Sequence, residues 1–354
     1  MTRSDILLEK LSAAGADAFL SGIPETRMYF SGFHSTDGTL LITAKETVLI
    51  VDFRYIEAAE AGVFDYCSAV MPKDGVAGLI RAKLEEAGAK RLAVEEKTVS
   101  MAEAERLKNA YGVELVPASD VISGICQRKD KTELEKIKKA QDITDRAFSR
   151  VLKLIKTDMT ELEVAAEIEY QMKLGGASGT SFDTICVSGP ASALPHGVPS
   201  AVKLRRGFLT MDFGCKYEGY CSDMTRTVVI GRADEDVKKV YNTVRKAQQL
   251  ALDAARPGIT GAELDKVARD YIYSEGYEGC FGHGLGHGVG MYIHEDPRVS
   301  PAGKTPLGEG HVVTVEPGVY LKGKYGCRIE DMIVFENGGV TDITHSPKDL
   351  IEIE

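Results

Sequence analysis

The feature that most constrains the fold is a pattern of helices and a hairpin that occurs twice, one hundred residues apart. Thr160-Glu161-Leu162-Glu163 and Thr260-Gly261-Ala262-Glu263 each place a hydroxyl three residues before a glutamate, which is the capping box that opens a helix. Each box follows a long amphipathic pattern, over residues 132–156 and 235–255, and each is followed by a hairpin pattern that carries two acids. Short echoes arise by chance, but the same elements in the same order predict an internal duplication.

The first hairpin pattern, Phe208–Val229, has Glu218-Gly219 as its turn signal. A two-residue loop there pairs position 212 with position 225, so Asp212 and Asp223 project from the same face as diagonal neighbours. Like charges this close repel, and a cation between them would relieve the repulsion. For this stretch alone, a solvated hairpin face explains the two acids equally well.

The second hairpin pattern, Val312–Phe335, turns at Lys322-Gly323-Lys324. A three-residue loop there puts Glu316 and Glu330 directly opposite each other, which destabilises a sheet unless something positive lies between them. Facing carboxylates in both halves are hard to explain as solvated surface twice over. The pair of hairpins therefore favours a metal site.

Histidines gather between the hairpins, in the glycine-rich stretch 281–295. A single histidine there is best explained as packed against the backbone, but three of the seven in the chain lie within twelve residues, at His283, His287 and His294. A phosphate-binding loop is disfavoured, because neither G-x-G-x-x-G nor G-K-[ST] occurs. His196 lies in a proline-bounded loop that suits the aiming of a side chain. Four carboxylates and an imidazole suit Mn²⁺, Co²⁺, Fe²⁺ or Zn²⁺, and acids that bridge a metal pair indicate hydrolysis.

The first 124 residues show no catalytic constellation. Strand and helix patterns alternate there, which predicts a small α/β layer domain over residues 1–124 and a second domain over residues 125–354. The charged run Gln127–Glu135 is interpreted as a linker that leads into a helix at about Glu133. Strands are expected at 18–21, 40–51 (two strands joined near residue 45), 91–94 and 113–116, and helices at 4–14, 53–61, 75–87 and 102–110.

Composition argues against several classes of partner. A net charge of −10 disfavours nucleic acid and anionic membranes. The amino-terminal residues lack the apolar core of a signal peptide, and no apolar run is long enough to span a bilayer. Seven cysteines without a C-x-x-C pair argue against a disulfide framework and against a thiolate zinc site, so we expect a cytoplasmic protein.

Five short motifs, in order, make a family resemblance specific. The motifs are D-F-G with Asp212, S-D-M-T-R-T with Asp223, G-H-G-V-G with His287, V-E-P-G with Glu316 and R-I-E-D with Glu330. This set resembles the pita-bread (creatinase/aminopeptidase) metallopeptidase family, in its Xaa-Pro dipeptidase (prolidase) and aminopeptidase P branch. The amino-terminal domain resembles the creatinase/prolidase N-terminal domain.

The resemblance implies an α+β catalytic domain with a pseudo-twofold duplication and a site for two divalent metal ions. Mn or Co would fit best, with Zn or Fe as alternatives. By motif position, Asp212 would bind one metal, His287 and Glu316 mainly the other, and Asp223 and Glu330 both. A hydroxide bridging the metals would attack the Xaa-Pro bond of dipeptides or short peptides, with Glu316 as proton shuttle.

Further roles are implied by the same resemblance. His196 and His294 match histidines that contact the scissile amide, and Arg298 matches a position near the proline end of the substrate, where it could hold a carboxylate. His283 would line the pocket, with a packing role as an equal alternative. The resemblance also implies a homodimer in which His34 and Asp37 could reach the partner's site, or else form an ordinary surface loop.

Two other functions remain open at this point. One is a creatinase-like hydrolase that works without metal, which the intact ligand set disfavours. The other is a non-catalytic peptide-binding module on the same fold. The sequence does not decide between dipeptidase and aminopeptidase specificity, nor which metal is used.

Overall fold

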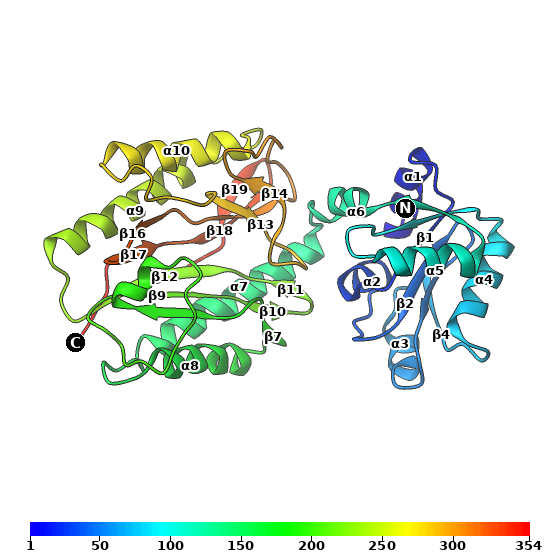
Figure 1. Ribbon diagram of the computed structural model, residues 1–354, viewed down its shortest axis with the longest axis horizontal. Helices are drawn as coiled ribbons and strands as arrows, with labels where there is room; N and C mark the ends of the chain where they lie inside the picture. Colours follow the sequence, from blue (N-terminus) through cyan, green and yellow to red (C-terminus); the bar gives the residue numbers. More distant parts are fainter. The chain divides into compact units, whose positions relative to one another are not determined.

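The computed structural model describes residues 1–354 and divides them into two compact units, Met1–Cys126 and Gln127–Glu354 (Figure 1). None of its helices combines the length and the apolar character needed to cross a bilayer. The expected linker is shorter than predicted, because helix α7 already begins at Lys131. Asp130 and Glu133 form a capping box at this point, in which each carboxylate accepts the backbone N–H of the other residue.

The first unit is an α/β layer structure, as the alternating pattern predicts. Its elements are α1 (Arg3–Ala13), β1 (Ala18–Ser21), α2 (Pro24–Ser31), β2 (Thr39–Thr43), β3 (Thr47–Ile50), α3 (Ile56–Gly62), β4 (Cys67–Val70), α4 (Val76–Ala87), β5 (Arg91–Val94), α5 (Met101–Tyr111), β6 (Glu114–Pro117) and α6 (Ser119–Cys126).

One sheet, ordered β4-β3-β2-β1-β5-β6, forms the core of this unit, and only β2 runs antiparallel to its neighbours. Alternate side chains of β3 point to opposite faces of the sheet. Val48 packs in the apolar cluster that includes residues of α4 and α5, whereas Leu49 packs against α3. The expected strands and helices are present. The short α2, β4 and α6 were not predicted from the sequence.

The second unit contains the duplicated pattern. Its elements are α7 (Lys131–Val151), α8 (Glu161–Leu174), β7 (Gly179–Thr180), β8 (Ile185–Ser188), the 3₁₀ helix η1 (Gly189–Ala193), β9 (Gly207–Phe213), β10 (Cys215–Tyr217), β11 (Tyr220–Cys221), β12 (Met224–Ile230), α9 (Glu235–Ala254), α10 (Gly261–Ser274), β13 (Gly286–Gly288), β14 (Glu295–Val299), β15 (Val312–Val315), β16 (Gly318–Leu321), β17 (Tyr325–Arg328), β18 (Asp331–Glu336), β19 (Gly339–Asp342) and β20 (Glu352–Ile353).

The two halves of this unit repeat one another in detail. Thr160 and Thr260 both cap a helix through the expected capping box, and each forms an isolated β-bridge to the loop ahead of its hairpin, with Lys203 and Pro306 respectively. The apolar faces of α7 and α8 pack on the first hairpin and those of α9 and α10 on the second. In Figure 1 the strands accordingly lie between the two helix pairs.

The first hairpin has the predicted register. Glu218 and Gly219 form its two-residue loop with φ of 46° and 85°, the positive values that a tight hairpin turn needs at both positions. Asp212 on β9 is paired with Thr225 on β12, as expected. On its other side β9 pairs with β8, which places Ile185 beside Asp212.

The second hairpin also turns where it was expected to, with Leu321 paired to Tyr325 across a three-residue loop. Its arms belong to two ladders, β16–β17 and β15–β18, that keep the same register on either side of a gap. Glu316 and Glu330 occupy opposite positions in this gap. Because the ladders separate there, the two acidic side chains leave the sheet toward the interior of the unit.

Candidate metal and peptide site

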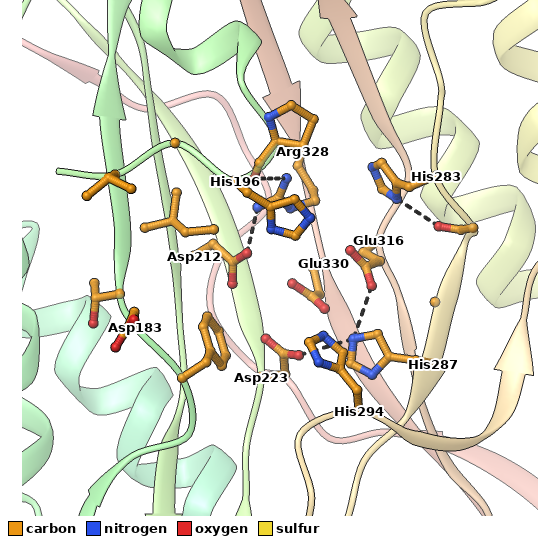
Figure 2. A pocket seen from close by; sticks show the side chains of 18 of the residues that line it. Asp183, His196, Asp212, Asp223, His283, His287, His294, Glu316, Arg328 and Glu330 are labelled. Carbon is orange, nitrogen blue, oxygen red and sulfur yellow. Dashed lines mark hydrogen bonds and ion pairs between the residues drawn. The ribbon is translucent and has the colours of Figure 1, made fainter. Parts of the chain in front are cut away.

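The two hairpins bring four carboxylates into one cavity of about 510 Å³. Asp212 lies on β9, Asp223 directly before β12, Glu316 directly after β15 and Glu330 between β17 and β18. Asp212, Asp223 and Glu330 are buried, and Figure 2 shows all four carboxylates directed toward one region. Each hairpin supplies two of these acids, as the repeat in the sequence suggested.

His287, on β13, joins this group from the glycine-rich stretch. Its Nε2 lies 3.5 Å from Asp223 Oδ2 and 3.3 Å from Glu316 Oε1 (Figure 2). Candidate ligand atoms of Asp223, His287 and Glu330 all lie within 4.8 Å of one another. The backbone of β13 can lie this close to β15 only because position 286 is glycine: a Cβ there would lie 2.0 Å from the carbonyl oxygen of Thr314.

Neighbouring polar groups fix the orientation of these side chains. The hydroxyl of Thr225 donates to Glu330 Oε2 at 2.7 Å, and the hydroxyl of Thr314 donates to Glu316 Oε1 at 3.0 Å. Thr314 also accepts the backbone N–H of His287. Such supporting bonds set the direction of potential ligands before any ion binds.

The buried guanidinium of Arg328 is a second organising group. Its Nη2 donates to Asp212 Oδ2 at 2.5 Å, its Nη1 to Tyr320 Oη and the carbonyl of Pro195, and its Nε to Thr225 Oγ1. The other oxygen of Asp212, Oδ1, is buried and has no hydrogen-bond partner. Arg328 therefore holds one oxygen of Asp212 and leaves the other directed at the cluster.

The electrostatics of the cluster favour a bound cation, which would take the place of the protons that the crowded acids otherwise hold. Burial, together with the neighbouring acids, raises the pKa of Asp223 and of Glu330 well above the ordinary value, and burial raises the pKa of Glu316 to about 7. Burial lowers the pKa of His287, so this imidazole is neutral and able to act as a ligand. Crowded acids, a neutral imidazole and the unpaired Oδ1 of Asp212 fit a site for divalent cations.

Three more histidines line the cavity. His196 and His294 are exposed at it, and the ring of His294 packs edge-on against His287 with centroids 4.5 Å apart. His283 is tied down: its Nε2 shares a hydrogen bond of 3.0 Å with Tyr320 Oη, and Nδ1 one of 2.8 Å with the carbonyl of Gly284. Burial, and next the charge of Arg328, lowers the pKa of His283 to about 4, so its role here combines lining and packing.

Arg298 is not among the residues that line this cavity, and its expected role at the proline end of a substrate stays a prediction. It is exposed on β14 between two buried residues, Pro297 and Val299, and strand alternation turns its side chain to solvent. The guanidinium at the cavity is instead that of Arg328, which the sequence reasoning missed. Strand alternation offered a signal: Arg328 precedes Glu330 by two positions, and residues two apart in a strand project to the same side.

The remaining predicted residues lie in the first unit. His34 is exposed, and Asp37 forms a 3.0 Å ion pair with Arg54. The buried guanidinium of Arg27 orders this loop by donating to the carbonyls of Ser35 and Gly38. The loop is thus built by contacts within its own unit, and a role in a partner's site stays a prediction.

Comparisons with known proteins agree with the geometry. Residues 135–337 match Metallopeptidase family M24, and residues 3–125 match the Creatinase/Prolidase N-terminal domain. The Xaa-Pro dipeptidase of Pyrococcus furiosus is 43% identical over 72% of this chain and 74% of its own length. The uncharacterised peptidase YqhT of Bacillus subtilis is 38% identical over 97% of this chain and 99% of its own.

Solved structures extend the likeness to the whole chain. The Xaa-Pro dipeptidase from Bacillus anthracis superposes with a TM-score of 0.95 at 38% identity, covering 99% of both chains. The X-Pro aminopeptidase from Thermotoga maritima superposes with a TM-score of 0.91 at 39% identity, covering 98% of this chain and 100% of that one. The family and fold-class predictions are confirmed: the chain is a metallopeptidase of family M24, with the pita-bread catalytic fold and the creatinase/prolidase N-terminal domain of the prolidase and aminopeptidase P branch.

Proposed function

We propose that this metallopeptidase is an Xaa-Pro dipeptidase that works with two divalent metal ions. The observation that carries the proposal is the set of four carboxylates and one neutral imidazole in a single cavity, with Asp212 Oδ1 buried and unpaired. Several relatives, among them the Pyrococcus furiosus and Pyrococcus horikoshii proteins, bear the name Xaa-Pro dipeptidase. Their names support the choice of substrate class.

The five ligands would be shared between the ions as their positions suggest. Asp212 would bind one ion, His287 and Glu316 mainly the other, and Asp223 and Glu330 both. When bound, such ions polarise a carbonyl and lower the pKa of water. The chain itself keeps the ligands in place through Thr225, Thr314 and Arg328.

Protein groups around the cluster would handle the peptide. Glu316, which lies beside His287 and accepts a hydrogen bond from Thr314, is the proposed proton shuttle. His196 and His294 have side chains at the cavity wall and can donate a hydrogen bond to the scissile carbonyl or a proton to the departing proline nitrogen, which has no N–H in the peptide. Four of the five N–H groups of Arg328 are already engaged by the protein, so Arg328 positions other residues rather than clamping a substrate carboxylate.

The decisive experiment compares an Xaa-Pro dipeptide with the matching Xaa-Pro-Xaa tripeptide, in the presence of Mn²⁺ and of Co²⁺. The proposal expects release of proline from the dipeptide and little turnover of the tripeptide. Efficient cleavage of the tripeptide would instead indicate an X-Pro aminopeptidase, the activity named for the Thermotoga maritima structure. Activity that survives exhaustive chelation would revive the metal-free hydrolase.

The ligand set is tested by Glu330→Gln, with Glu336→Gln as the matched control on β18, outside the cavity. We expect the first substitution to abolish turnover and to lower the bound metal measured by elemental analysis. The control should do neither. Full activity with Glu330→Gln would overturn the proposed site.

A further inference from the structure

One carboxylate at the cavity has no place in the metal cluster. Five carboxylates line the cavity, and four of them, Asp212, Asp223, Glu316 and Glu330, form the proposed ligand set. The fifth is Asp183, which is exposed and takes part in no hydrogen bond or ion pair of the structure. A charged side chain that lines a substrate cavity without a partner is free to bind a group of the substrate.

The position of Asp183 separates it from the metal ligands. It precedes β8 by two residues, and Ile185 at the start of β8 is paired with Asp212. In Figure 2 Asp183 lies beside this strand, apart from the group formed by Asp223, Glu316 and Glu330. Its neighbours in sequence, Phe182, Thr184 and Ile185, also line the cavity and carry no charge. Asp183 thus presents the one negative charge of this segment of the cavity wall.

The charges of an Xaa-Pro dipeptide determine which end can approach this residue. The proline end carries the carboxylate, and the proline nitrogen is acylated and uncharged, so any positive charge lies on the Xaa residue. Asp183 repels the proline carboxylate and attracts the Xaa end. The α-ammonium group is confined near the scissile carbonyl, whereas a long cationic side chain can extend from there to the cavity wall.

We propose that Asp183 is a specificity-determining residue that favours substrates with lysine or arginine at the Xaa position. This inference rests on the proposed Xaa-Pro activity and adds the residue that reads the Xaa side chain. Because Asp183 is exposed, its ion pair with the substrate would be screened by solvent and salt, and we expect a roughly two- to fivefold effect.

The test compares kcat/KM for Arg-Pro and Leu-Pro in the metal-loaded, full-length protein and in Asp183→Asn. The ratio of Arg-Pro to Leu-Pro should fall by roughly two- to fivefold, and mostly through KM, because the pair forms already in the ground-state complex. The change should shrink at high ionic strength. Asp183→Lys should lower the ratio further and raise the relative activity on Glu-Pro. Asp183→Glu, which keeps the charge, should retain most of the preference.

Asp158→Asn is the matched control, because Asp158 is an exposed aspartate of the same unit that does not line the cavity. It should leave the ratio unchanged. A ratio that is the same in wild type, Asp183→Asn and Asp183→Lys would overturn the inference while leaving the proposed activity intact. A wild-type protein that cleaves none of the dipeptides would refute the proposed function itself, so the two failures are distinguishable.

Discussion

The buried ion pair between Lys129 and Glu295 gives the sharpest test of the physical reasoning. The ammonium of Lys129 contacts the carboxylate of Glu295, and the two side chains are only 1% and 11% exposed. The carboxylate occupies space that depends on glycine, because a Cβ at Gly290 would lie 2.6 Å from it. Glu295 directly follows His294, so this pair anchors the start of β14 next to a cavity residue.

Replacement of Lys129 by methionine should destabilise the second unit by about 3–5 kcal/mol, the usual cost of removing one partner of a buried pair. The cost arises because the methionine keeps the apolar stem but leaves the charge of Glu295 buried and unpaired. Replacing both residues, as Lys129→Met with Glu295→Gln, should recover most of this loss, since no charge then remains buried.

The loss should depend on pH in a defined direction. Burial already raises the pKa of Glu295 although Lys129 lowers it, so removal of Lys129 raises this pKa further. A folded-state pKa above the unfolded value means that the folded variant retains its proton. The penalty relative to wild type is therefore small below the folded-state pKa that Glu295 has in the wild type, and it grows by about 1.4 kcal/mol per pH unit above this point until the pH passes the folded-state pKa of the variant.

Urea denaturation at acidic and at mildly alkaline pH measures these differences. Far-UV circular dichroism suits the measurement, because the chain has no tryptophan. Lys266→Met is the control: it breaks an exposed helical pair with Asp270 and should cost less than about 1 kcal/mol at either pH. A penalty for Lys129→Met that equals the control, or that stays constant with pH, would refute the reasoning.

Three further outcomes are expected. Tyr320→Phe removes the hydroxyl shared by Arg328 and His283 and should lower metal affinity or kcat/KM by about 10–100-fold; normal kinetics and metal content would contradict this. Thr225→Val should cost about 1–3 kcal/mol in a denaturation experiment, because it leaves buried oxygen and nitrogen atoms of Glu330 and Arg328 unpaired; a neutral effect would argue against these bonds. Metal binding should release protons, and affinity should rise as the pH rises through the neutral range, because the acids of the cluster hold protons in the metal-free state. Calorimetry in two buffers of different ionisation enthalpy measures this release, and its absence would count against the raised pKa values.

Local chemistry allowed the sequence to predict the frame of the site. The two-residue turn at Glu218-Gly219 is enough to set the pairing of Asp212 with Thr225, because register follows from loop length. The same holds for the three-residue turn of the second hairpin, which puts Glu316 opposite Glu330. The capping boxes at Thr160 and Thr260 likewise act within four residues and were readable as such.

Contacts between segments far apart in the chain could not be predicted from turns, caps and strand register. Two arginines illustrate the difference: the motif indicated Arg298, yet the structure turns Arg298 to solvent and brings Arg328 against Asp212, 116 residues away in the chain. The partner of Glu295 is Lys129, 166 residues earlier, in a run interpreted as a linker. No period or spacing connects such residues, because their proximity depends on how whole helices and sheets pack.

The sequence by itself determined the family, the two hairpins and the kinds of ligand they carry, because turns, caps and strand alternation act over a few residues. The tertiary structure decided which charges are paired and which remain free. It brought the four acids together in one cavity, raising the pKa of three of them, used Arg328 to hold Asp212, and left Asp183 at the cavity without a partner. Burial and pairing depend on the surroundings of each group in the folded chain, and these surroundings come from segments far apart in sequence.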